Sequence, residues 1–216
     1  MNAKPRTDIR WGFLRETQKE IDKDPYDPVN GYPRTCLIDY LREIFPNTHD
    51  WIHNKGMQDV KGLNGRLRPD CRSDSLKLLI EFDGVQHYTN PEQIIKDREH
   101  TRLYRNAGYF VVRIPYFIQL TTATVNEMFW EVLTTEFKKD LFDPSVASVY
   151  SGLHNTPAFL CYLGLKRMAE DFIRYPEQYE VNLQALRAEA NPDLTGIDIL
   201  EQEVSLLKSR LSVANR

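Results

Sequence analysis

The stretch IEFDGVQH, residues 80–87, places two carboxylates two positions apart at the end of a hydrophobic run. Side chains alternate between the two faces of a strand, so Glu81 and Asp83 share one face of a strand that is otherwise hydrophobic. An unpartnered charge inside a sheet is costly. The two carboxylates therefore predict a site where something positively charged or chemically demanding is bound.

A polar turn around Ser75 joins this strand to a second alternating segment, RLRPDCR at residues 66–72, so the two are predicted to form an antiparallel hairpin. If the chain folds about Ser75 and the residue after it, Asp70 lies opposite Glu81. Directly opposed β-carbons are roughly 5 Å apart. Asp70, Glu81 and Asp83 are therefore expected to converge on one patch, where a divalent cation such as Mg²⁺ would relieve their repulsion.

The rest of the chain completes a predicted α/β core with a mixed sheet flanked by helices. Helical or strand periodicity appears in four further segments, which are a helix over 35–45, a helix over 91–107 closed by Gly108, a strand over 109–117 and a helix over 125–139. We expect three regions. These are an N-terminal arm or small subdomain over 1–34, the core over 35–145 and an all-helical C-terminal region over 146–216.

Composition narrows the function classes. The chain has 216 residues and a net charge of −3, which argues against a protein held on nucleic acid by bulk charge alone. No apolar run is long enough to span a membrane, so no membrane partner and a cytoplasmic location are expected. The three cysteines, Cys36, Cys71 and Cys161, are widely separated and suggest neither a disulfide framework nor a zinc site.

The motif RPD, ten intervening residues and then EFD resembles the PD-(D/E)xK nuclease superfamily. The longer pattern EFDGVQHY, Asp97 and GYFVVRIPY is similar to the branch of very-short-patch repair endonucleases and their restriction and homing relatives. The resemblance covers about residues 35–135 and implies a restriction-endonuclease-like fold. It also implies an endonuclease that hydrolyses DNA phosphodiesters, with Mg²⁺, or Mn²⁺ in its place, held by Asp70, Glu81 and the Phe82 carbonyl.

The sequence departs from that superfamily at Asp83, which occupies the position where most members carry lysine. In the repair-endonuclease branch a histidine shortly after the strand takes a comparable place, and His87 matches it. The predicted catalytic set is therefore Asp70, Glu81, Asp83 and His87. The general base remains open between His87, Gln86, Asp83 and a metal-bound water without a protein base.

Further residues are candidates for supporting roles. Asp97 has two candidate roles. It would orient His87 or a basic residue in the site, or it would lie in the first turn of its helix and complement the helix dipole. We favour the first-turn role. Glu43 matches in order an acidic residue near the metal in many superfamily members, and a solvated helix face explains it equally well. Three arginines at helical spacing are expected either to contact DNA phosphates or to form an exposed stripe; these are Arg98, Arg102 and Arg105.

Hydrophobic residues at alternating steps of three and four mark residues 197–211 as a dimerisation helix of a homodimer or a helix that packs on its own domain. Two alternative functions also stay open. One is a catalytically inactive nucleic-acid-binding or scaffold protein on the same fold. The other is a structure-specific or RNA nuclease.

Overall fold

The computed structural model describes residues 37–84, 86–118, 120–141, 161–188 and 197–214. The arm predicted over 1–34 lies outside them. A four-stranded mixed sheet with the order β1-β2-β3-β4 forms the centre of the fold, with antiparallel pairing except for the parallel pair β3-β4. The strands are β1 Trp51–His53, β2 Cys71–Ser73, β3 Leu78–Asp83 and β4 Phe110–Pro115. The predicted α/β class with a mixed sheet is confirmed.

The predicted hairpin register is also confirmed. Cys71 pairs with Ile80, so Asp70 lies directly opposite Glu81, one position beyond the end of β2. The connecting turn is held by Asp50, whose carboxylate accepts hydrogen bonds from the hydroxyl of Ser73 at 2.7 Å and from the backbone N–H of Ser75 at 2.8 Å. The polar residues between the strands thus form the turn.

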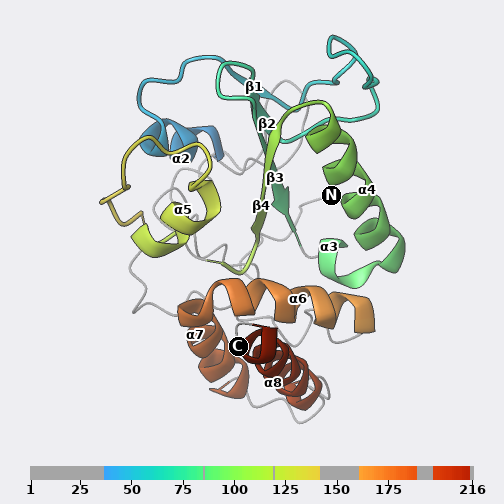
Figure 1. Ribbon diagram of the computed structural model, residues 1–216, viewed down its shortest axis with the longest axis vertical. Coiled ribbons are helices and arrows are strands. Elements are labelled where there is room, and N and C mark those ends of the chain that lie inside the picture. The colour runs from blue at the N-terminus through green and yellow to red at the C-terminus, as the bar shows by residue number, and fades with distance from the viewer. Residues whose placement is uncertain (1–36, 85, 119, 142–160, 189–196, 215–216) are drawn as a thin grey trace, which may run out of the picture.

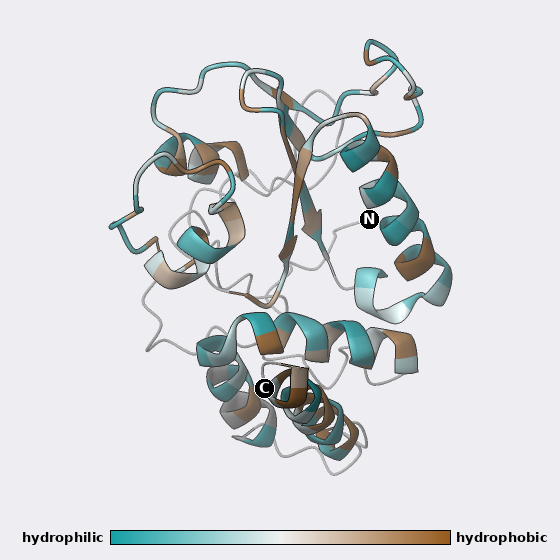
Figure 2. Ribbon diagram, in the orientation of Figure 1, coloured by the Kyte–Doolittle hydropathy of each residue, from teal (hydrophilic) through white to brown (hydrophobic). Residues whose placement is uncertain are grey.

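Helices cover both faces of the sheet (Figure 1). On one face lie α2, Leu37–Ile44, and α5, Thr122–Phe129, over a large core that includes Ile80; on the other lies α4, Pro91–Asn106, over a smaller core that includes Leu79. The strands are mainly hydrophobic and much of α4 is hydrophilic (Figure 2). Because side chains alternate along β3, its charged residues share the face of Leu79 and point toward α4.

Local signals set the position of α4. Asn90 caps its first turn by accepting a hydrogen bond from the N–H of Glu92 at 3.0 Å, and Pro91 occupies the first helical position. Gly108, which follows the helix, has a φ of 87°, a conformation that favours glycine. Between β3 and α4 the chain makes one short helix, α3, Gln86–Thr89.

The predicted helix over 125–139 is wrong in both boundaries. α5 begins at Thr122, where the side chain of Thr121 accepts a hydrogen bond from the N–H of Thr124, and it ends at Phe129. The following segment folds back along the helix instead of extending it. The side chain of Asn126 bonds both the N–H and the carbonyl of Phe137, at 2.7 and 3.0 Å.

The described C-terminal residues are helical, as expected. They form α6 Tyr162–Arg174, α7 Pro176–Ala188 and α8 Ile197–Ala214, next to the sheet end where β3 and β4 finish (Figure 1). Leu200 and Val204 of the predicted seam are buried within the chain, where α8 lies against α6. Leu211 is exposed. The first part of the seam therefore packs on its own domain, and a dimer remains a prediction. None of the described helices has the length and apolar character needed to cross a membrane.

Candidate functional site

Asp70 and Glu81 form a reciprocal pair across the hairpin. The carboxylate of Asp70 accepts a hydrogen bond from the backbone N–H of Phe82 at 2.7 Å, and the N–H of Asp70 lies 3.4 Å from Oε2 of Glu81. Each acidic side chain is therefore fixed by the backbone of the opposite strand. The two carboxylates meet because the hairpin register brings them together.

The electrostatics of this pair favour an added cation. Burial, followed by the negative charge of Asp70, raises the pKa of Glu81 to about 8. Burial also raises the pKa of Asp70, against the effect of the Phe82 N–H. Neither residue forms a salt bridge with the part of the chain that the structure describes. Two neighbouring carboxylates that resist ionisation are a donor set that Mg²⁺ suits, because the cation prefers oxygen ligands.

Asp83 does not present free oxygens to this pair. It is completely buried, and Arg113 of β4 binds both of its oxygens, with Nη2 to Oδ1 at 2.7 Å and Nε to Oδ2 at 2.8 Å. Arg167 of α6 also binds Oδ2. The negative charge of Asp83 still contributes to the raised pKa values of Asp70 and Glu81. The expected patch therefore consists of two partly buried carboxylates without an arginine partner among the described residues and a third that is already paired with arginine.

Asp97 belongs to the same network of ion pairs. Its oxygens lie 3.0 Å from Nη2 of Arg113 and 2.7 Å from Nη1 of Arg167. Burial alone would raise the pKa of Asp97, but hydrogen bonds from His87 and Arg167 and the charge of Arg113 lower it overall. Asp97 is the seventh residue of α4, so the expected first-turn role is wrong and its orienting role is supported.

His87 is held through one ring nitrogen. Its Nδ1 lies 2.7 Å from Oδ2 of Asp97 and 3.2 Å from Oδ1 of Asp83, and its side chain is 25% exposed. Two carboxylates at Nδ1 favour the tautomer that carries its proton there. Nε2 is then the basic nitrogen and is the one available for proton transfer.

Asp83, His87 and Asp97 lie close enough together to be considered as metal ligands, with candidate atoms within 4.8 Å of one another. Arg113 and Arg167 already contact both carboxylates and balance their two negative charges. A further cation would meet two guanidinium groups at this position. Asp70 and Glu81 are therefore the better candidates for a metal site.

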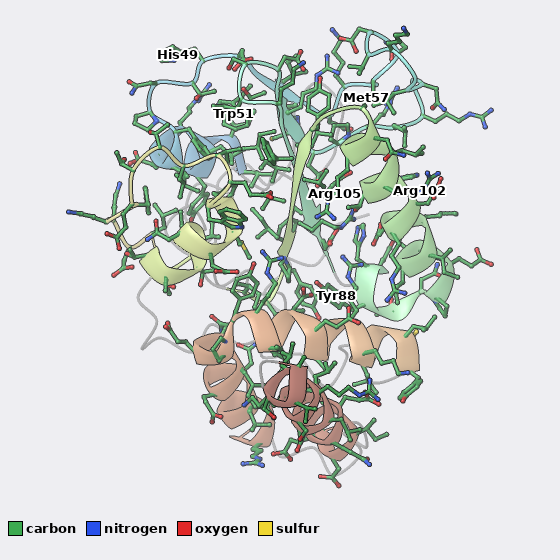
Figure 3. The ribbon with its side chains drawn as sticks, viewed as in Figure 1. His49, Trp51, Met57, Tyr88, Arg102 and Arg105 are labelled. Carbon is green, nitrogen blue, oxygen red and sulfur yellow. The ribbon has the colours of Figure 1, made fainter. Side chains whose placement is uncertain are left out.

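In the part of the chain that the structure describes, none of the other predicted residues forms a side-chain hydrogen bond or salt bridge with the acidic residues or the histidine of this site. Glu43 lies on α2, on the opposite face of the sheet, and forms an exposed salt bridge with Lys139 at 2.6 Å, which favours the solvated helix face over the supporting role. Gln86 is exposed on α3. The three predicted DNA-contacting arginines, Arg98, Arg102 and Arg105, are exposed on α4; the last two are labelled in Figure 3.

The sequence interpretation missed Arg113, Arg167 and Tyr88. Arg113 gave a signal, because it is the only charged residue in the strand FVVRIP. Arg167 gave none, since it lies 84 positions from Asp83. Tyr88, labelled in Figure 3 beside α6, stacks under the Arg167 guanidinium at 4.8 Å and donates a hydrogen bond to Asp171 at 2.7 Å.

The comparisons with known proteins do not extend this description, since no family model, no curated protein and no solved structure matches the chain.

Proposed function

We propose that this protein is a metal-dependent nuclease that hydrolyses phosphodiester bonds in DNA, with Asp70 and Glu81 as the metal-binding carboxylates. The observation that carries the proposal is the pair itself. Two carboxylates are fixed by opposite strands and destabilised by each other, without a salt bridge among the described residues. A pair of this kind weakens a protein unless it binds something, because each charge makes the other more costly.

In this proposal each residue has a defined task. Mg²⁺ would be bound by Asp70 and Glu81 and would supply Lewis-acid polarisation of a phosphate oxygen. His87 takes a proton from water through Nε2 while Asp97 holds Nδ1. Arg113 and Arg167 hold Asp83 and Asp97 in place through ion pairs. β3 has Asp83 at the position where most superfamily members carry lysine. His87, which follows the strand, is the residue that takes over the proton-transfer role of that lysine in this proposal.

The test compares the wild-type protein with Asp70→Asn and Glu81→Gln, two substitutions that preserve shape and remove charge. Cleavage of duplex, single-stranded and branched DNA and of RNA is measured with Mg²⁺, with Mn²⁺ and with excess chelator. We expect metal-dependent cleavage by the wild type and a loss of orders of magnitude in each variant. Glu177→Gln, at an exposed position of α7, is the control and should cleave as the wild type does.

Two results would overturn the proposal. The first is full cleavage by either site variant or in chelator. The second is an absence of cleavage of every substrate with either metal, which would leave the inactive binding or scaffold protein as the better description. Preference for branched DNA or for RNA would keep the chemistry and change the substrate.

A further inference from the structure

A second candidate site adjoins the ion-pair network formed by Asp83, Asp97, Arg113 and Arg167. A pocket of about 500 Å³ is lined by residues of α4, β4 and α6, together with Asp83 of β3 and Tyr88 of α3. In the described part of the chain β4 pairs only with β3, so this pocket follows the open edge of the sheet. Neither Asp70 nor Glu81 lines it. The lining is basic overall, because four acidic residues (Asp83, Asp97, Glu170 and Asp171) are outnumbered by six arginines: Arg98, Arg102, Arg105, Arg113, Arg167 and Arg174.

Most of these arginines already have acidic partners. Arg113 and Arg167 are matched by Asp83 and Asp97, as described above. Arg102 forms a bidentate pair with Glu99 at 2.6 and 2.8 Å on the helix surface. Arg174 lies 3.8 Å from Glu127, at a position where both side chains are about half exposed.

Arg98 and Arg105 are different, because neither has a salt bridge or side-chain hydrogen bond to any residue that the structure describes. Both are exposed residues of α4 that line the pocket. Two uncompensated guanidinium groups at the border of one pocket attract an anion, and arginine matches the geometry of phosphate oxygens.

The spacing of these two arginines suits successive phosphates of a nucleic-acid strand better than a single phosphate. They are seven residues apart on one helix, which is about 10.5 Å along its axis. Phosphates of one DNA strand advance by about 3.4 Å per nucleotide along the duplex axis, so the separation corresponds to about three nucleotides. Tyr88, the aromatic residue that lines the pocket, is completely buried beneath Arg167 and offers no face for stacking a base. Contact would therefore be with the backbone.

We infer that this pocket binds the sugar–phosphate backbone of a polynucleotide strand through Arg98 and Arg105, at a position separate from the Asp70–Glu81 pair and without base recognition. The inference rests on the proposed function for its choice of ligand. Binding here would place part of the nucleic acid against α6, so that the C-terminal helices take part in holding the substrate.

The test measures binding in chelator, so that cleavage plays no part in it. Fluorescence anisotropy of labelled single-stranded and duplex oligonucleotides gives the affinity over a range of salt concentrations. The full chain is compared with the double variant Arg98→Glu/Arg105→Glu. The matched control is Lys208→Glu/Arg210→Glu, which makes the same change in net charge at two exposed positions of α8 outside the pocket. Thermal unfolding checks that each variant is folded.

We expect the pocket variant to bind at least about 10-fold more weakly than the wild type, irrespective of the oligonucleotide sequence. Its plot of log affinity against log salt should be less steep by about 1.4 to 1.8, since each lost phosphate contact removes about 0.7 to 0.9. The control should bind as the wild type does. Inorganic phosphate and a mononucleotide should compete only weakly.

Four results would overturn the inference. These are undetectable binding by the wild type, unchanged binding by the pocket variant, an equal loss in the α8 control, which would indicate bulk charge, and competition by phosphate or a mononucleotide as effective as that by an oligonucleotide. The last result would assign the pocket to a single phosphate group. Absence of cleavage would count against the proposed function and leave this binding test unaffected.

Discussion

One ring nitrogen of His87, Nδ1, is bound by carboxylates of the protein, and the other, Nε2, is available for proton transfer. Because Nδ1 is bonded to Asp97 and lies near Asp83, the imidazole is oriented without any contribution from substrate. We expect His87→Ala to lower the single-turnover cleavage rate by about 10²-fold with little change in DNA affinity, and to remove the acidic limb of the pH–rate profile. His49→Asn, at an exposed position, serves as the control. Normal cleavage with weakened binding would instead assign His87 to phosphate contact.

Asp171 links single-residue protonation to the stability of the fold. Burial, opposed by the charge of Arg167 and by the Tyr88 hydroxyl, raises its pKa from 3.8 to about 6. Between these two values the unfolded chain ionises this group while the folded chain keeps it protonated. Its contribution to stability is therefore complete below about pH 3.8 and is lost as the pH rises through about 6.

Asp171→Asn should remove this dependence, because asparagine keeps the acceptor for Tyr88 and does not titrate. We expect the stability of the variant relative to the wild type to rise by about 2 kcal/mol between about pH 4.5 and 7.5. The whole pKa difference corresponds to about 3 kcal/mol at 1.36 kcal/mol per pH unit, of which about a third is already lost at pH 4.5. Urea unfolding of both proteins at about pH 4.5 and at about pH 7.5 measures this change in relative stability. A constant difference between the two proteins across this range would contradict the assignment.

The predicted and the missed site residues show which side-chain contacts can be predicted from the sequence. Asp70 and Glu81 lie 11 positions apart in one hairpin, and the period of two along each strand fixes which side chains oppose. Arg167 reaches Asp83 only because α6 docks against the ends of the strands, and no local pattern encodes that contact. Local pairing was therefore predictable, whereas the cation that stabilises Asp83 was not.

Among the elements, α6 is joined to the core by a charged residue. Arg167 is 12% exposed and donates to the His87 carbonyl at 2.8 Å as well as to Asp83 and Asp97. Removal of one partner from a buried ion pair typically costs 3–5 kcal/mol, because the remaining charge stays buried. We expect Arg167→Met to lower the free energy of unfolding by about this amount, as measured by urea denaturation.

Arg174 on the same helix is the matched control. Its pair with Glu127 is exposed, so Arg174→Met should cost about 1 kcal/mol or less. Equal losses in the two variants would show that α6 is held by its hydrophobic face alone. That face includes Leu165, Met168 and Phe172, which belong to the large core.

Elements were predictable where their periodicity is long, and not where tertiary contacts set their boundaries. α4 has a capping asparagine, a first-turn proline and a terminal glycine, all readable in sequence. β1 has three residues, too few to show alternation. The end of α5 depends on Asn126 bonding Phe137 from the returning segment. A helical pattern continues past Phe129 in the sequence, but the side-chain contact determines the structure.

At the scale of the whole molecule, the Asp70–Glu81 pair opposes folding by itself and would support folding if it bound the proposed cation. Repulsion between the carboxylates and their burial both weaken the metal-free protein. A metal that binds the folded chain alone stabilises it by RT ln(1 + [metal]/Kd), about 2.7 kcal/mol at 100 times Kd. In the proposed function, the two residues that bind the metal would therefore be the ones that cost stability without it.

This opposition gives a test in which the melting temperature is measured with chelator and with saturating Mg²⁺ or Mn²⁺. In chelator, Asp70→Asn should match or exceed the wild type in thermal stability, because it removes a carboxyl group whose ionisation burial opposes while keeping an acceptor for the Phe82 N–H. With metal, the wild type should melt several degrees higher than in chelator, since about 1 kcal/mol corresponds to 2–4 °C in a chain of this size. The variant should show little of that gain. Equal responses to metal in both proteins would place the cation elsewhere. A variant much less stable than the wild type in chelator would mean that Asp70 serves the fold rather than a metal.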